Sequence, residues 1–335
     1  MNILRKFLLP FSLLYWMITE VRNMLYDFNI LRSSSFSTPV ITVGNLRVGG
    51  TGKTPMIEYL LDFLLPHYST ATLSRGYGRK TKGFYILKGN ETADIPGDEP
   101  LQFKIKFPEA IVVVDEERRR GINNIINNFS PEVILLDDAF QHRKVKAGLN
   151  ILLTSYGNLY TSDWILPAGN LRESVKGAKR AEIIVVTKCP PDLSVNEEWD
   201  IKKELDISES QQLFFTYIDY NLQIINNKGS LFLDQISAKS VLLVTGIANP
   251  GSLVDFLKER GINFQHENFP DHYEFSENDI SGFSKADIVL TTEKDYMRLK
   301  DKFVHPHLYY MPIRFKFARN ESKFENIISK FVNKK

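Results

Sequence analysis

A glycine-rich segment near the amino terminus limits what this chain can fold into more than any other feature. An apolar, β-branched run at 39–43 leads into a loop with three glycines at 49–52, and a helix-like segment follows at 56–65. Strand, glycine-rich loop and helix predict a phosphate-binding loop, because backbone N–H groups surround a polyphosphate beside the positive end of the helix. The strict pattern has glycine at position 47, where this chain has Arg47.

The residues of this loop have separate expected roles. Lys53 is expected to reach the β- and γ-phosphates, and the Thr54 hydroxyl to bind Mg²⁺. The expected nucleotide-binding residues are Arg47, Val48, Gly49, Gly50, Thr51, Gly52, Lys53 and Thr54. The segment 186–190 stands where a GTPase carries Asn-Lys-x-Asp, but it lacks the final Asp, so ATP is the expected nucleotide.

Apolar runs alternate with helical patterns along the first part of the chain. The runs that we interpret as buried strands are 69–73, 111–114, 133–136, 150–154 and 183–187. This alternation predicts an α/β fold with a P-loop-type, doubly wound parallel sheet. Ligands of such sheets bind at the carboxyl ends of the strands.

The length of 335 residues favours two domains. A hairpin pattern around 226–229 and a new strand-turn-helix pattern from Val241 suggest where the first domain ends. We expect an amphipathic helix at 1–30, a P-loop domain at 31–212, a β-hairpin linker at 213–239 and a smaller α/β domain at 240–335.

Carboxylates and one histidine are candidates for the chemistry. Asp137 and Asp138 end an apolar strand, where a carboxylate beside a phosphate loop can hold Mg²⁺. Asp98 lies on what the sequence suggests is a constrained turn, and an Asp can accept the proton of a hydroxyl during phosphoryl transfer. Carboxylates on turns more often bond their own backbone. His272 follows a predicted strand and is a candidate partner that orients Asp98.

The amino-terminal segment is apolar but short. Its uncharged part, 7–19, has 13 residues, whereas a spanning helix needs about 20. No small-residue cleavage site of a secretory signal follows. Basic flanks at Arg5, Lys6 and Arg22 favour a helix that lies in a membrane interface, and the alternative is a helix packed on the domain core.

Overall composition excludes some classes of protein. A net charge of +2 argues against bulk nucleic-acid binding. The single Cys189 excludes a disulfide framework and is interpreted as a buried small residue.

Seven segments, in this order, resemble the tetraacyldisaccharide 4′-kinase family of lipid A biosynthesis. They are 43–45 with 49–55, 74–79, 97–100, 137–142, 167–173, 269–272 and 291–295. The departures are small: Ala139 replaces an expected glycine, and Tyr273 replaces a second histidine. The resemblance covers most of the chain.

The resemblance implies transfer of the γ-phosphate of ATP to the 4′-hydroxyl of a tetraacyl glucosamine disaccharide 1-phosphate. It implies two α/β domains with a cleft between them, Asp98 with His272 as the catalytic base pair, Lys53 as a further catalytic residue, and Mg²⁺ at Thr54 and at Asp137 or Asp138. The expected substrate-binding residues are Arg75, Glu99, Gln141, Arg172 and Glu173, and the two arginines would neutralise phosphates.

A lipid acceptor stays in the bilayer, so the resemblance also implies a peripheral enzyme at the cytoplasmic face of the inner membrane. The segment 7–24 would then lie in the leaflet interface. Two other functions remain open from the residues alone: a soluble P-loop kinase or ATPase for a small metabolite, and a nucleotide-binding scaffold without turnover. Acyl-chain preference, domain closure and oligomeric state are also left open.

Overall fold

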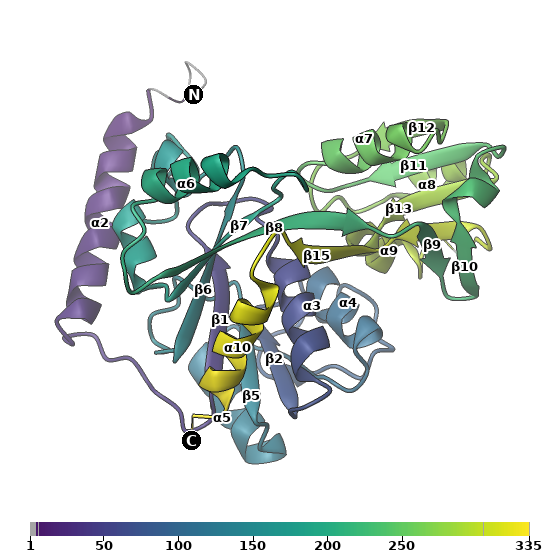
Figure 1. The fold of residues 1–335 in the computed structure, drawn as a ribbon. Helices are drawn as coiled ribbons and strands as arrows, with labels where there is room; N and C mark the ends of the chain where they lie inside the picture. Colours follow the sequence, from purple (N-terminus) through teal and green to yellow (C-terminus); the bar gives the residue numbers. More distant parts are fainter. Residues whose placement is uncertain (1–4, 6, 304, 335) are drawn as a thin grey trace.

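Two β-sheets, each flanked by helices, form two α/β domains (Figure 1). The computed structural model describes residues 5, 7–303 and 305–334. The larger domain contains the phosphate-binding loop, and the smaller domain projects from one edge of it.

The larger domain is built on a nine-stranded sheet in the order β15-β8-β7-β6-β1-β5-β2-β4-β3. Its strands are β1 (Val40–Asn45), β2 (Thr70–Ser74), β3 (Tyr85–Ile86), β4 (Ile111–Val114), β5 (Val133–Asp137), β6 (Leu149–Ser155), β7 (Ile183–Thr187), β8 (Gln212–Tyr220) and β15 (Ile313–Phe317). All neighbours pair in parallel except the two edge strands, β3 and β15. The predicted strands at 111–114 and 183–187 are confirmed to the residue.

Helices and short 3₁₀ segments connect or follow these strands. They are α3 (Lys53–Leu64), α4 (Asp98–Lys106), α5 (Arg118–Phe129), η1 (Tyr160–Ser162), η2 (Val175–Arg180), α6 (Val195–Glu204) and α10 (Glu321–Val332). Apolar side chains of α3 pack on the sheet: Met56, Ile57, Leu60, Leu61 and Leu64 are all fully buried. This packing holds the start of α3, and therefore the phosphate-binding loop, at the carboxyl end of β1.

The smaller domain has a six-stranded sheet in the order β10-β9-β14-β13-β11-β12. Its elements are β9 (Gln223–Asn226), β10 (Gly229–Phe232), η3 (Leu233–Ile236), β11 (Val241–Thr245), α7 (Gly251–Glu259), β12 (Phe264–Asn268), α8 (Glu277–Phe283), β13 (Ile288–Thr292), α9 (Glu293–Leu299) and β14 (Leu308–Met311). The doubly wound α/β architecture with a second, smaller α/β domain is confirmed.

The domain boundaries differ from the predicted ones. Residues 213–239 are not one hairpin linker, because β8 is a full strand of the larger sheet and only β9 and β10 form a hairpin. Residues 313–332 belong with the larger domain, since β15 pairs antiparallel with β8 and α10 packs beside it. The chain therefore enters the smaller domain along β8 and returns along β15 (Figure 1).

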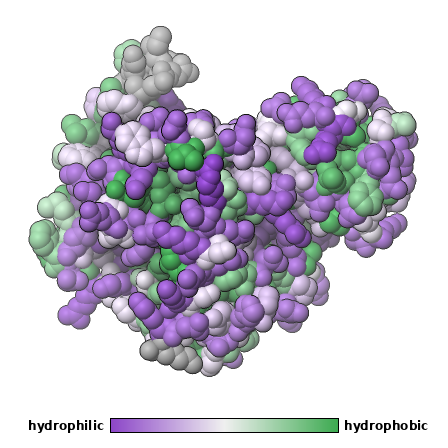
Figure 2. All heavy atoms as spheres, viewed as in Figure 1, coloured by the Kyte–Doolittle hydropathy of each residue, from purple (hydrophilic) through white to green (hydrophobic). Residues whose placement is uncertain are grey.

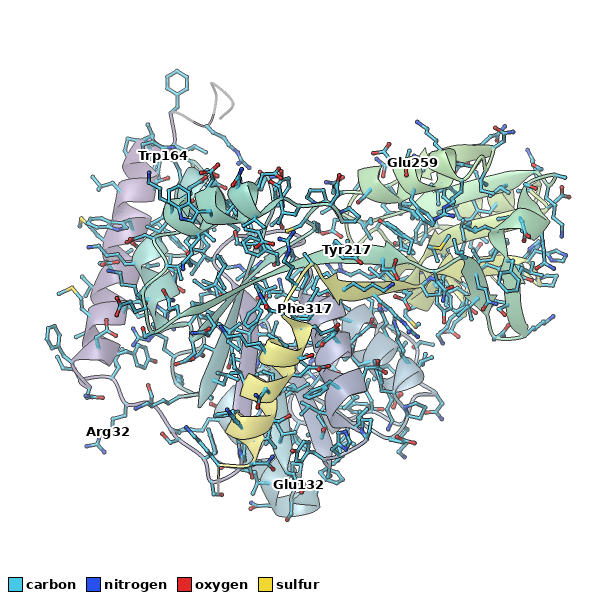
Figure 3. The ribbon with its side chains drawn as sticks, viewed as in Figure 1. Arg32, Glu132, Trp164, Tyr217, Glu259 and Phe317 are labelled. Carbon is cyan, nitrogen blue, oxygen red and sulfur yellow. The ribbon has the colours of Figure 1, made fainter. Side chains whose placement is uncertain are left out.

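The carboxyl-terminal helix α10 joins the larger core through one apolar face. Phe324, Ile328 and Val332 recur at i, i+4 and i+8, and all three are buried. The Phe324 ring lies 4.8 Å from the ring of Phe317 on β15 and 5.3 Å from that of Phe214 on β8. Figure 3 shows Phe317 where the returning strand meets the helix. Sequence separation of about a hundred residues hides this pairing from any local pattern.

The predicted turn at 97–100 is instead the start of a helix. Gly97 is the N-cap of α4 with φ of +96°, and Asp98 is the first helical residue. Acidic side chains are favourable in a first helical turn because they face the positive end of the helix dipole. Asp98 is therefore held on a rigid element rather than on a loop.

The amino-terminal helix α2 (Leu9–Asp27) packs on the larger domain through its polar side. Ser12 accepts a hydrogen bond from the backbone N–H of Ala168 at 2.9 Å, Tyr15 donates to the carbonyl of Arg172 at 3.0 Å, and Asn23 donates to Glu173 at 2.9 Å. The opposite side carries exposed apolar residues: Phe11, Leu13, Leu14, Met17, Ile18, Val21 and Met24. Figure 2 shows apolar side chains along the edge of the molecule that α2 occupies.

This arrangement reverses the usual amphipathic pattern, in which the apolar stripe faces the core. No helix within the described residues has the length and hydropathy needed to cross a bilayer.

Candidate active site

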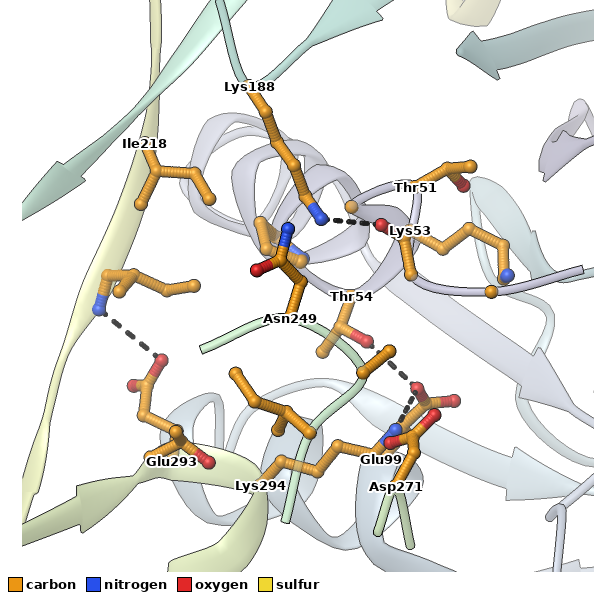
Figure 4. Close-up of a pocket in the computed structure, with 18 of the residues that line it drawn as sticks. Thr51, Lys53, Thr54, Glu99, Lys188, Ile218, Asn249, Asp271, Glu293 and Lys294 are labelled. Atoms are coloured by element: carbon orange, nitrogen blue, oxygen red, sulfur yellow. Dashed lines mark hydrogen bonds and ion pairs between the residues drawn. The ribbon is translucent and has the colours of Figure 1, made fainter. Parts of the chain in front are cut away.

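A cavity of about 480 Å³ lies where the two domains meet, and residues of both domains line it (Figure 4). The larger domain contributes the phosphate-binding loop, residues 48–55, together with Glu99, Asp138, Arg172 and Lys188. The smaller domain contributes Asn249, Asp271, His272, Glu293 and Lys294. The cavity thus lies at the carboxyl ends of parallel strands, the expected ligand position in such sheets.

The phosphate-binding loop needs glycine at position 52. Gly52 has φ of +86°, a conformation that glycine adopts without strain, and it is the N-cap of α3. A Cβ atom at this position would lie 2.5 Å from the ring of Phe315 on β15. Lys53 follows as the first helical residue, so the free N–H groups of α3 point toward the cavity with the lysine beside them.

Side chains at the carboxyl end of β7 hold the phosphate-binding loop from the other side. The Thr187 hydroxyl donates to the carbonyl of Thr51 at 2.8 Å, and the Lys188 ammonium donates to the carbonyl of Gly50 at 2.6 Å. Burial lowers the pKa of Lys188. Arg47 pairs with Asp163 at 2.8 Å, outside the phosphate-binding loop. This pairing explains how the loop accommodates an arginine where the strict pattern has glycine.

The two aspartates at the end of β5 have different environments. Asp138 lies 2.9 Å from Arg172 and 3.6 Å from the Lys53 ammonium. Burial acts to raise the pKa of Asp138, but these two cations hold it below the ordinary value. Burial, with the neighbouring carboxylates of Glu99 and Asp138, raises the pKa of Asp137 to about 7. Asp137 Oδ1 is buried and has no hydrogen-bond partner among the described residues.

These donors fit a magnesium ion. Asp137 Oδ1 is a buried carboxylate oxygen without a partner among the described residues, and the adjacent Asp138 lines the same cavity as Thr54, so a cation there would gain oxygen ligands. The described residues contain no cluster of three or more His, Cys, Asp and Glu side chains suited to hold a metal alone. Magnesium in nucleotide sites needs no such cluster, because phosphate oxygens and waters complete its coordination.

Asp98 and His272 come together across the domain boundary. His272 Nδ1 lies 3.3 Å from Asp98 Oδ2, and Arg298 Nε lies 3.8 Å from the same oxygen. Asp98 is 7% exposed. Burial acts to raise the pKa of Asp98, but His272, Lys294 and Arg298 together hold it below its ordinary value. The carboxylate is therefore ionised at neutral pH and able to accept a proton.

A chain of polar contacts joins this pair to the phosphate-binding loop. Thr54 donates to Glu99 Oε1 at 3.1 Å, and Lys294 donates to the same oxygen at 3.2 Å (Figure 4). The Lys294 ammonium also lies 3.0 Å from His272 Nε2. Thr54 and Glu99 belong to the larger domain, whereas Lys294 and His272 belong to the smaller one. The catalytic candidates of the two domains are therefore physically linked.

The structure brings together only some of the predicted substrate-binding residues. Glu99 and Arg172 line the cavity. Gln141 donates to the backbone of Asn45 and to Glu173, and Glu173 is buried beneath α2, where it also pairs with Arg180. Arg75 is exposed just after β2. The roles of these residues remain predictions.

Sequence reasoning gave no role to three cations at the site: Lys188, Lys294 and Arg298. Lys294 lies within 291–295, a segment noted for its resemblance but not for its chemistry. Arg298 donates to the carbonyls of Gly246 and Tyr273, so it holds the loops on both sides of His272. Cys189 is buried, as predicted, and burial raises the pKa of its thiol to about 12.

Comparisons with known proteins agree with this arrangement. Residues 4–333 match the family model described as tetraacyldisaccharide-1-phosphate 4′-kinase. A tetraacyldisaccharide 4′-kinase of Flavobacterium johnsoniae is 51% identical over 99% of this chain and 98% of its own length. One of Bacteroides thetaiotaomicron is 41% identical over 98% of this chain and 93% of its own length.

A solved structure is also similar. The crystal structure of an "apo" form of LpxK from Aquifex aeolicus in complex with ATP superposes with a TM-score of 0.81 at 33% sequence identity. The match covers 98% of this chain and 100% of the other.

Proposed function

The chain belongs to the tetraacyldisaccharide 4′-kinase family, and we propose that it transfers the γ-phosphate of ATP to the 4′-hydroxyl of a tetraacyl disaccharide 1-phosphate, with Asp98 and His272 accepting the proton. One observation carries the assignment of the base: the buried Asp98 lies 3.3 Å from His272 at a cavity that also contains the phosphate-binding loop. Phosphoryl transfer needs little covalent help from protein, so positioning and charge stabilisation dominate.

The proposed reaction is a single displacement. The 4′-oxygen forms a bond to the γ-phosphorus, the bond from that phosphorus to the β–γ bridging oxygen breaks, and ADP leaves. The hydroxyl proton passes to the Asp98 carboxylate, which His272 orients. Lys53 stabilises the charge that develops on the transferring phosphoryl group.

Mg²⁺ is part of the proposal. Thr54 and the aspartates at the end of β5 would hold it, with Asp137 the better candidate because its Oδ1 atom has no protein partner among the described residues. When bound, the ion neutralises charge on the β- and γ-phosphates. Asp138 is less free to bind metal, since Arg172 and Lys53 already contact it.

We also propose that α2 lies in the interface of the inner membrane, at its cytoplasmic face. The support is the reversed orientation of the helix: its polar residues bind the protein, and its apolar residues are exposed. Trp164, 58% exposed, lies beside the amino-terminal end of α2 (Figure 3), and tryptophan favours the membrane–water boundary. A helix packed on the core through its apolar face would show the opposite pattern.

A direct transfer assay tests the chemistry. ³²P from γ-labelled ATP is followed into the lipid acceptor in mixed micelles with Mg²⁺, for wild type, Asp98→Asn and Asp94→Asn. Asp94 is a matched control, because it lies four residues away in a surface pair with Lys80. Loss of a general base lowers the rate by about 10²–10⁴-fold, whereas the control is expected to match wild type.

The outcomes separate the alternatives. Labelled lipid from wild type and the control, strongly reduced in Asp98→Asn, supports the proposal. An Asp98→Asn rate near that of wild type contradicts the assignment of the base. No labelled lipid from wild type, with ATP still bound, favours a kinase for a soluble metabolite or a scaffold without turnover.

A further inference from the structure

Lys294 occupies a central position between the two halves of the site. It lies in the first turn of α9 in the smaller domain, with its ammonium 3.2 Å from Glu99 Oε1 and 3.0 Å from His272 Nε2. Burial acts to lower the pKa of Lys294, but the carboxylates of Glu99, Asp98 and Asp271 raise it above the ordinary value. The side chain is therefore a charged ammonium, which donates hydrogen bonds and accepts none.

This charge determines which nitrogen of His272 carries the proton. A nitrogen that faces an ammonium at 3.0 Å must accept, so Nε2 has no hydrogen. The proton is then on Nδ1, the nitrogen that faces the Asp98 carboxylate at 3.3 Å. Asp271 Oδ2 is 4.0 Å from Nε2, which is too far for a hydrogen bond that would compete with Lys294.

We propose that Lys294 is a positioning residue that holds His272 as the neutral Nδ1–H tautomer, directed at Asp98. The proposal rests on the proposed roles of Asp98 and His272. In this tautomer the N–H of Nδ1 faces Asp98 Oδ2, a buried oxygen with no hydrogen-bond partner among the described residues, and is the donor available to orient the oxygen that accepts the substrate proton. In the other tautomer, the unprotonated Nδ1 of His272 and the Asp98 carboxylate oxygen would face each other as two acceptors, and the carboxylate would lose this orientation.

Lys294 also connects the pair to the nucleotide site. Its second partner, Glu99, accepts a hydrogen bond from Thr54 of the phosphate-binding loop. One ammonium therefore contacts both His272 of the base pair and Glu99, the hydrogen-bond partner of the phosphate-binding loop.

Kinetics give the first test. Lys294→Met retains the length of the side chain and removes the charge, Lys294→Arg keeps a charged donor, and Lys300→Met is the matched control. Lys300 caps the same helix and pairs with its neighbour Asp301. Partners that orient a metal-bound imidazole typically contribute about 10- to 100-fold, and we take the same range for this imidazole. We expect kcat to fall by that factor in Lys294→Met, with little change in KM for ATP, and Lys294→Arg to recover part of it.

Nitrogen-15 NMR of histidine gives the second test, because a protonated and an unprotonated ring nitrogen have well-separated shifts. The His272 signals are identified as those missing in His272→Gln. Wild-type protein at neutral pH is expected to show a protonated Nδ1 and an unprotonated Nε2. Lys294→Met is expected to lose the single fixed tautomer, because no donor then faces Nε2, and to show the proton shared between the two ring nitrogens. Lys294→Arg is expected to keep the unprotonated signal.

Each result decides the proposal. A wild-type spectrum with the proton on Nε2 overturns it, and this result needs no variant of Lys294. A Lys294→Met kcat within threefold of wild type also overturns it. If Lys294 had a purely structural role, Lys294→Met would lose folding without a change of the His272 tautomer, and the two measurements distinguish this from the proposal. The spectrum does not depend on catalysis, so the tautomer can be established even where Asp98→Asn shows that the proposed base is wrong.

Discussion

Replacing two apolar residues on the outer face of α2 is expected to release the protein from membranes without unfolding it. Phe11 and Ile18 lie seven residues apart, which places them on one face of the helix, and they are 62% and 60% exposed. The double variant Phe11→Ser/Ile18→Ser changes only side chains that face away from the larger domain.

The magnitude follows from the exposed fractions. Full burial of a Phe or Ile side chain is worth about 1.5–3 kcal/mol. At roughly 60% exposure, each residue adds about 1.5 kcal/mol to membrane transfer, and the pair about 3 kcal/mol. A difference of about 3 kcal/mol corresponds to roughly a 150-fold weaker partition into lipid.

Flotation with vesicles of phosphatidylethanolamine and phosphatidylglycerol measures this partition. Phe232→Ser is the control, because Phe232 is 50% exposed on β10 of the smaller domain, away from α2. Wild type and control are expected in the lipid fraction, the double variant in the soluble fraction, and all three with equal melting temperatures. Flotation of the double variant equal to that of wild type would refute the membrane role of this face.

Three further results are expected. Lys53→Met should lower kcat by about 10²–10³-fold in the transfer assay, since it removes a charge from the phosphoryl site. Because the pKa of Asp137 is raised to about 7, a proton competes with Mg²⁺ for this carboxylate below that pH. Titration of activity with Mg²⁺ should therefore show an apparent Mg²⁺ affinity that rises from pH 6 to 7 and levels off above pH 7. In Asp137→Asn, only the smaller pH dependence that comes from protonation of ATP should remain. Phe324→Ala should lower the free energy of unfolding by about 3–5 kcal/mol in urea melts, because the ring is fully buried in the larger core, whereas exposed Phe129→Ala should have little effect.

Local sequence predicted the strands of the larger sheet well, because buried parallel strands are short, continuous apolar runs. The run at 133–136 became β5, and the run at 150–154 became the centre of β6. The same signal failed to predict which sheet a strand joins. Residues 313–317 form a good strand in either domain, and the decision depends on pairing with β8, about a hundred residues earlier.

The candidate site was predictable where a residue type has one dominant use. A lysine after a glycine-rich loop and paired aspartates after an apolar strand are such cases. Lys294 was not predictable in this way, because its meaning depends on Glu99 and His272, which come from different domains. The role of Asp98 stays a prediction, and its predicted turn was wrong, because the helix dipole that favours an acidic first turn leaves a sequence pattern similar to that of a turn.

The contacts of α2 suggest how a membrane-bound acceptor and a nucleotide from solution meet in one cleft. Tyr15 donates to the carbonyl of Arg172, and the guanidinium of Arg172 binds Asp138 beside the phosphate-binding loop. Arg172 therefore connects the polar face of the proposed membrane helix directly to the nucleotide site. A helix that packed on the protein through its apolar face would lose its protein contacts whenever that face entered lipid. Because α2 uses its polar face for the protein, it can occupy the interface and remain attached to the catalytic domain at the same time.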